Sequence, residues 1–285
     1  MPEVRVVVSE ELDRYMDTIV RKGLFGSKAE LIRAALMRYI ETLPVRVPSG
    51  YDTDSIFSPD GRIFQVEYAI ECAKRGSTIV GLRYKGGAIL AKQKPKPPKE
   101  AGVPYTVSAP WEDFEVDQHV GVVSAGLASD FILLKDKAVK EAQAYRREYG
   151  EPISVEELTR RLSLFMHSHT LRVDVRPLGC ILLIGGVDKS GCRLFILDAS
   201  GAYREVKAGS AGSGVEKANK VLSEGYSPEM PFMKALTLTV KALLEGEKDR
   251  GPDRVVAVVV EEETGVIRRI SSKELEEALK TAFGL

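Results

Sequence analysis

The stretch FSPDGRIFQVEYAIECAKRGSTIVGL, residues 57–82, places Ser77 and Thr78 directly behind a glycine at the head of a β-rich run. A hydroxyl in this place can act as a nucleophile only if a general base lies beside it. It can equally be an ordinary residue at the start of a strand. The residues that surround the pair distinguish a nucleophile from a structural residue.

From Ser77 onward, β-rich runs alternate with helical runs in blocks. Ser154 with Glu157 has the spacing of a capping box at a helix start, and a last helix is expected to open at Ser271. Paired strands at both ends of paired helices predict an α+β fold with two antiparallel sheets face to face and helices outside, a four-layer αββα sandwich. The expected helices cover residues 130–150, 154–169, 214–226 and 232–247, and the expected strands lie within 77–85, 87–93, 119–126, 180–188, 192–206 and 254–271.

The segment YDTDSIFSPDGRIFQVEYA, residues 51–69, followed by GSTIVGL, resembles the N-terminal signature of proteasome α subunits. The similarity continues through DVRPLGCILLIGGVD, LFILDASGAYREVKAGSAGSG and the C-terminal strands, so it covers residues 51–285. It implies the N-terminal nucleophile hydrolase fold, which agrees with the layer order above. It also implies a subunit of seven-membered rings that cap the proteolytic β rings and gate the entry of unfolded substrate.

In the catalytic β relatives that this resemblance brings in, the nucleophile is an N-terminal threonine whose own amine is the base, supported by an Asp and a Lys. Here the threonine position falls on Ser77, the Asp position on Gln93, and the Lys position on Glu112 or Asp113. The nitrogen of Ser77 is an amide unless the chain is cut after Gly76. An amide is no base, Gln93 is neutral, and a carboxylate would raise the pKa of the hydroxyl. We therefore expect no catalytic residue, no cofactor and no metal, although the chain could belong to a threonine-type endopeptidase complex.

The resemblance also implies a cluster that holds the gate of α subunits, and its counterparts here are Tyr51, Asp52, Pro59 and Tyr68. The lysine that receives the C-termini of activator ATPases in this family aligns with the same Glu112 or Asp113. Because like charges repel in a partly buried pocket, we expect such docking to be severely weakened.

Residues 1–46 form a separate module, joined through the connector 47–50 to the large domain, which we assign to residues 47–285. A strand over Val4–Val8 is expected to precede two helices, and Ser27 with Glu30 has capping-box spacing at the second. A single unpaired strand with two helices buries too little surface alone, so we expect a dimer. The order of elements resembles the ribbon-helix-helix family, in which two chains pair their strands.

That family implies DNA binding through the ribbon, and the candidate contacts are Arg5, Ser27 and Lys28. Residues 1–46 carry eight Lys or Arg against seven Asp or Glu, so the expected basic footprint is missing. Dimerisation alone is favoured over DNA binding. The alternative hypothesis is a DNA-associated transcriptional regulator that uses the proteasome-like domain as an oligomerisation scaffold.

The whole chain has 285 residues, 44% hydrophobic, with 41 basic and 41 acidic residues, which suits a globular protein. No run reaches the length of a membrane span and no signal peptide is evident, so we expect a cytoplasmic protein without a membrane partner. Its expected partners are other copies of itself, in a ring or an even-numbered oligomer, and β-type proteasome subunits.

Overall fold

The computed structural model describes residues 7–42, 56–94, 114–172, 174–247 and 251–284. Its contacts divide the chain into two compact units, residues 1–50 and residues 51–285. Within the described ranges, no helix is both long and apolar enough to cross a membrane.

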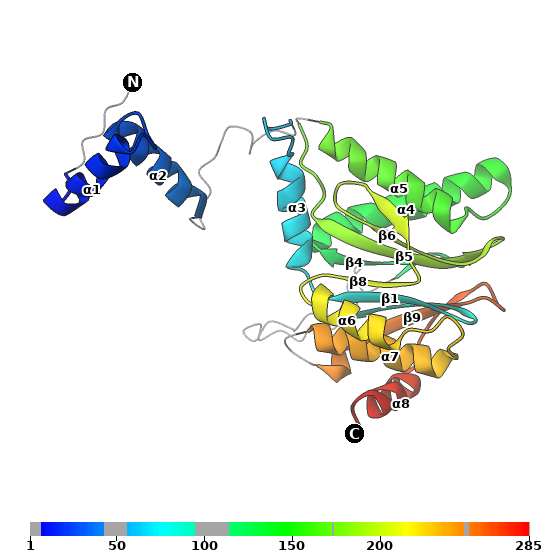
Figure 1. Cartoon of the computed structure of the whole chain (residues 1–285). Coiled ribbons are helices and arrows are strands. Elements are labelled where there is room, and N and C mark those ends of the chain that lie inside the picture. The colour runs from blue at the N-terminus through cyan, green and yellow to red at the C-terminus, as the bar shows by residue number, and fades with distance from the viewer. Residues whose placement is uncertain (1–6, 43–55, 95–113, 173, 248–250, 285) are drawn as a thin grey trace, which may run out of the picture. The chain divides into compact units, whose positions relative to one another are not determined.

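The first unit contains helices α1 (Glu10–Arg21) and α2 (Lys28–Thr42) (Figure 1). The Oγ atom of Ser27 accepts the N–H of Glu30 at 3.2 Å, as a capping residue does. The Glu30 carboxylate accepts the N–H of Gly26 at 2.8 Å, so the reciprocal bond of the expected capping box is made one residue earlier.

The strand expected over Val4–Val8 is not formed at Val7 and Val8, and its other residues lie outside the described part of the chain. The side chain of Val7 is 99% exposed. A ribbon strand takes its hydrogen bonds from a second chain, so a single chain offers these two residues no strand to pair with.

The second unit is built on two five-stranded sheets, which run β10-β9-β2-β1-β8 and β3-β4-β5-β6-β7. Every strand pair in them is antiparallel. The strands are β1 (Ile79–Tyr84), β2 (Gly87–Gln93), β3 (Glu115–Asp117), β4 (Val120–Gly126), β5 (Cys180–Asp188), β6 (Gly191–Leu197), β7 (Tyr203–Glu205), β8 (Ala208–Ala211), β9 (Val255–Glu261) and β10 (Ile267–Arg269).

Helices cover the outer face of each sheet, which gives four layers (Figure 1). One apolar cluster joins the first sheet to α6 (Val215–Gly225), α7 (Phe232–Gly246) and α8 (Ser272–Phe283). A second joins the other sheet to α4 (Ala128–Tyr149) and α5 (Val155–Thr170), and a third lies between the sheets. The predicted α+β fold with two antiparallel sheets is therefore confirmed. Helix α3 (Phe64–Lys74) precedes β1, and a 3-10 helix over Pro252–Arg254 precedes β9.

Two helix starts follow their sequence signals. The Oγ atom of Ser154 accepts the N–H of Glu157 at 3.2 Å and begins α5. Ser271 and Glu274 form a complete capping box at the start of α8. These caps satisfy backbone N–H groups that would otherwise lack partners.

Candidate functional site

The turn that leads into α3 is organised by Ser58, a buried residue. The backbone N–H of Ser58 donates to the carbonyl of Arg62 at 2.8 Å, and Gly61 donates back to the carbonyl of Ser58 at 2.8 Å. The Ser58 hydroxyl donates to the Asp60 carboxylate at 2.5 Å and accepts the N–H of Arg62 at 3.1 Å. Gly61 has a φ of 79°, which favours glycine. Pro59 therefore lies in a turn that hydrogen bonds fix on both sides.

The same turn is tied to the first turn of α3 by a bidentate ion pair. Arg62 donates from Nε and Nη2 to the two carboxylate oxygens of Glu67, at 2.7 and 2.5 Å. This pairing raises the pKa of Arg62, and the hydrogen bond from Ser58 lowers the pKa of Asp60. The guanidinium also lies 4.8 Å from the centre of the Phe64 ring. The planar fork of arginine suits both contacts at once.

Of the four residues expected to form the gate cluster, the structure describes Pro59 and Tyr68, which lie within one turn–helix segment. Tyr68 lies on α3 and its ring stacks on Phe64, with centroids 6.5 Å apart and planes at 21°. Tyr51 and Asp52 lie outside the described residues.

The sequence pattern did not single out Ser58, Arg62 or Glu67. The Ser-Pro-Asp-Gly order was an available signal for the turn, because each of these residue types favours one turn position. No sequence rule predicts that the following arginine would pair with a glutamate inside the helix.

Helix α3 meets the sheets through direct backbone contact. A Cβ atom built on Gly76 would lie 2.1 Å from the backbone nitrogen of Gly126, at the end of β4. Ala73, one turn earlier, is completely buried. Only glycine allows two backbones to approach so closely, so Gly76 and Gly126 determine the path of the chain from α3 into β1.

Ser77 is exposed, whereas its neighbour Thr78 is completely buried and holds the head of β1 in place. The Oγ1 atom of Thr78 accepts the N–H of Gly214 at 3.1 Å. The N–H of Thr78 donates to Oε1 of Glu247 at 2.5 Å, and the N–H of Ser213 donates to the carbonyl of Gly76 at 2.9 Å. The buried hydroxyl of the pair is thus engaged in structural hydrogen bonds.

Gln93, at the expected position of the acidic partner, lies on β2 and is 4% exposed. Its Nε2 atom donates to the carbonyl of Gly251 at 2.8 Å. Gln93 pairs with Val255, which belongs to the cluster under α6 and α7. Its amide is therefore engaged with the segment before β9. Glu112 and Asp113 lie outside the described residues.

In the N-terminal unit, the ammonium group of Lys28 is engaged by α1. Its Nζ atom lies 2.7 Å from Asp13 Oδ1 and 2.8 Å from Asp17 Oδ1, and these hydrogen bonds raise the pKa of Lys28. Because two carboxylates already neutralise this ammonium group, its attraction for a DNA phosphate is weaker. Of the other candidate DNA contacts, Ser27 caps α2, and Arg5 lies outside the described residues.

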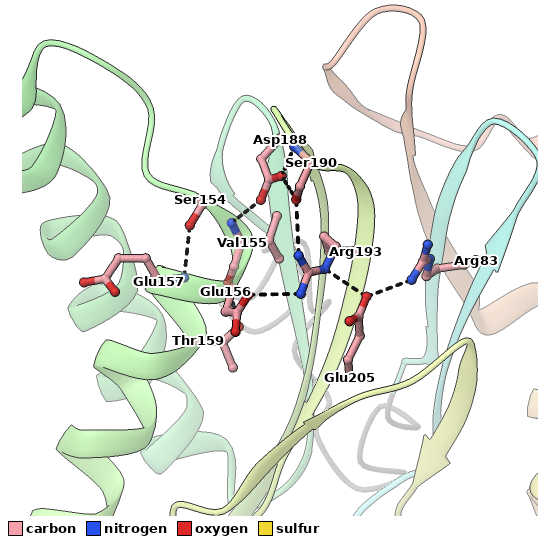
Figure 2. A network of polar contacts seen from close by, with 10 residues as sticks. All are labelled: Arg83, Ser154, Val155, Glu156, Glu157, Thr159, Asp188, Ser190, Arg193 and Glu205. Carbon is pink, nitrogen blue, oxygen red and sulfur yellow. Dashed lines mark hydrogen bonds and ion pairs between the residues drawn. The ribbon is translucent and has the colours of Figure 1, made fainter.

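A network of polar side chains links β1, β6, β7 and the start of α5 in the second unit (Figure 2). Oε1 of Glu205 accepts hydrogen bonds from Arg83 and Arg193, both at 2.8 Å, and so joins β1 of one sheet to β6 of the other. Arg193 also donates to Glu156 at 3.0 Å and to Ser190 at 3.2 Å. The network links both sheets to a helix, and nothing in the sequence pattern indicated it.

Asp188 extends this network to the N-terminus of α5. Its carboxylate accepts the N–H of Val155 at 2.9 Å and the hydroxyl of Ser190 at 2.5 Å. Burial alone would raise the pKa of Asp188, but these hydrogen bonds hold it below its usual range. Among the residues that the structure describes, no group of His, Cys, Asp and Glu is arranged to hold a metal ion.

The two-sheet α+β sandwich, preceded by the turn–helix segment before β1, is the arrangement expected of a proteasome-type subunit, and here the chain has an additional N-terminal unit. A family model described as "Proteasome subunit" matches residues 73–260, and a second model, which describes the N-terminal signature of the A-type proteasome subunits, matches residues 51–71. The chain therefore belongs to the proteasome subunit family and is of the α type.

Similar curated proteins carry the same description. The proteasome alpha subunit of Methanopyrus kandleri is 38% identical over 230 residues, which cover 81% of this chain and 92% of that protein. The proteasome alpha subunits of Methanothermobacter thermautotrophicus and Thermococcus sibiricus are each 38% identical, and the matches cover 80% and 81% of this chain and 91% and 89% of theirs.

Proposed function

We propose that this chain is a non-catalytic proteasome α-type subunit, or a paralogue of one, in a ring-like assembly associated with or derived from the core particle. Its N-terminal unit is a ribbon-helix-helix module that pairs subunits over the ring face. Its partners are further copies of itself and β-type subunits, in the cytoplasm. Subunits of the α type are generally non-catalytic, and the observation that carries the proposal here is the continuous path from α3 through Gly76 into β1.

This path leaves Ser77 without a free amine. The peptide bond between Gly76 and Ser77 lies between a glycine in backbone contact with β4 and a threonine whose N–H is bound by Glu247. Gln93 adds a neutral amide that bonds to Gly251. A serine that has an amide nitrogen, with a neutral glutamine at the expected position of the acidic partner, cannot carry out threonine-type proteolysis.

The pairing role of the N-terminal unit is supported by the apolar side chains that it exposes. Leu12 and Tyr15 on α1 are 48% and 66% exposed, and Leu36 and Tyr39 on α2 are 51% and 63% exposed. Burying four such side chains against a second chain at about 25 cal/mol per Å2 favours association by several kcal/mol. The engaged ammonium of Lys28 favours this role over DNA reading.

The test is the native mass of the full-length protein purified from its own cells, with identification of every partner. We expect a ring-sized species that contains a β-type subunit, and a different oligomer size after deletion of residues 1–46. The chain alone should show no hydrolysis of fluorogenic peptides, and its intact mass should show no start at Ser77. A monomer, or hydrolysis lost on Ser77→Ala, would refute the proposal.

DNA binding is measured separately on the full-length protein. Binding to random duplex DNA at physiological salt should be about micromolar or weaker, and Arg5→Ala should not change sequence preference. A selection that enriched one palindromic site, lost on Arg5→Ala, would favour the regulator hypothesis instead.

A further inference from the structure

The second unit has two opposite lateral edges that differ in charge. One edge, here named the β7–β8 edge, consists of the outermost strand of each sheet, β7 and β8. The opposite edge contains β10 and β3, and the N–H of Ile267 on β10 donates to the carbonyl of Gln118 beside β3 at 2.7 Å. Identical subunits that repeat head to tail contact each other through two different surfaces, and these two edges are a candidate pair.

The β7–β8 edge carries cations that have no partner in the described structure. Arg204 and Lys207 are exposed, and neither forms an ion pair with a described residue. Glu205 lies between them in sequence, but its carboxylate is bound by Arg83 and Arg193 (Figure 2). The carboxylate that could neutralise this edge is therefore already engaged across the two sheets.

These two cations line a groove of about 450 Å3 between the edge and α6. The lining of the groove includes Ile196, Val206 and Leu222 and contains no acidic side chain. The groove is thus suited to an apolar side chain that is flanked by carboxylates.

The turn between β9 and β10 offers that combination. Glu262 and Glu263 are exposed and form no ion pair within the described ranges, and Val266, three residues on, is 46% exposed. Arg268 does not neutralise them, because it is bound to Glu261 at 2.8 Å and to Glu274 at 3.1 Å. Arg269, also exposed, lies at the far end of β10 from this turn.

The strand register places Lys207 and the β9–β10 turn near the same end of the first sheet. The N–H of Arg83 donates to the carbonyl of Lys207, and Arg83 pairs with Ala88, which pairs with Val260, which in turn pairs with Ile267. This row crosses the sheet from one edge to the other, and Glu262 lies two residues beyond Val260. A second copy placed beside the β7–β8 edge and offset by about 7 Å along the strands, which is the length of two residues, would place its β9–β10 turn against Lys207.

We propose that the β9–β10 turn of one subunit docks in the groove at the β7–β8 edge of the next copy, with Glu262 and Glu263 facing Arg204 and Lys207. This rests on the proposed ring assembly and names the contact that closes it. The charges set the register and orientation of neighbours, and the apolar contact of Val266 with the groove contributes the hydrophobic part. The same contact makes ring formation sensitive to salt.

The test uses the full-length protein and charge reversal. Arg204→Glu with Lys207→Glu makes the edge variant, and Glu262→Lys with Glu263→Lys makes the turn variant. The control variant reverses Lys217 and Lys241 to Glu, two exposed lysines on α6 and α7 that form no ion pair with a described residue. Native mass is measured across a dilution series, and thermal melting shows whether each variant is folded.

We expect the edge and turn variants each to raise the concentration needed for ring formation by about tenfold or more, because like charges then meet. A chain that carries all four reversals should regain the ring, and the control variant should match the wild type. Ring formation that is insensitive to the reversals, or a quadruple variant that stays apart, would overturn this inference while leaving the proposed function intact. A wild-type protein that forms no ring would refute both.

Discussion

The substitution Thr78→Val tests whether the buried hydroxyl of Thr78, and not the exposed hydroxyl of Ser77, stabilises the head of β1. Valine keeps the shape of Thr78 but removes Oγ1, which accepts the buried N–H of Gly214 at 3.1 Å. Leaving that N–H without a partner costs about 1–3 kcal/mol. For a domain of this size, each kcal/mol lowers the melting temperature by roughly 2–4 °C. We therefore expect Thr78→Val to melt about 4–8 °C lower, taking the middle of the range.

The matched control is Ser77→Ala, which alters an exposed residue. Its melting temperature should stay close to that of the wild type, because surface substitutions usually cost under about 0.5 kcal/mol. Thermal melting of the purified proteins at equal concentration measures both. Equal stability of Thr78→Val and the wild type, or a larger loss for Ser77→Ala, would show that the hydroxyl assignments at the head of β1 are wrong.

Arg193→Met should lower the free energy of unfolding by about 1–3 kcal/mol, which is more than the loss expected for Arg83→Met. The reason is that Arg193 bonds three partners of the network, whereas Arg83 bonds one. Chemical denaturation measures both variants, and equal losses would refute this ranking. Arg160 and Arg161 lower the pKa of Glu157 from 4.5 to about 2. Stability that Glu157 contributes is present above pH 4.5 and is lost as the pH falls toward 2. The free energy of unfolding of the wild type should therefore fall more on acidification than that of Glu157→Gln. Equal losses of unfolding free energy in the two proteins as the pH is lowered would contradict this.

Much of the second unit could be predicted because its signals are local. The β-rich runs indicated the strands, and Ser154 and Ser271 marked helix starts that the structure confirms. The side-chain hydrogen bonds of Gln93 and Thr78 could not be predicted, because their partners at Gly251 and Gly214 lie more than a hundred residues away in sequence. Sequence spacing carries no information about contacts of that range.

The candidate site shows the same division. Pro59 and Tyr68 came from resemblance, and the structure adds the bonds of Ser58 and Arg62 that give the segment its shape. Lys28 is a candidate DNA contact from the resemblance, and the sequence pattern did not show that Asp13 on α1 binds its ammonium group. A periodic pattern identifies a helix face but not which carboxylate of a neighbouring helix will meet a lysine there.

The contact of Gly76 with Gly126 has a mechanical consequence. Where side chains separate two elements, rotamer changes can absorb a small displacement. Here backbone meets backbone, and the Cβ of alanine at Gly76 would already lie 2.1 Å from a main-chain nitrogen. A displacement of the segment that follows α3 therefore requires the end of β4 to move with it. We therefore expect a displacement of the turn at Pro59, which Arg62 and Glu67 tie to this helix, to displace the end of β4 as well.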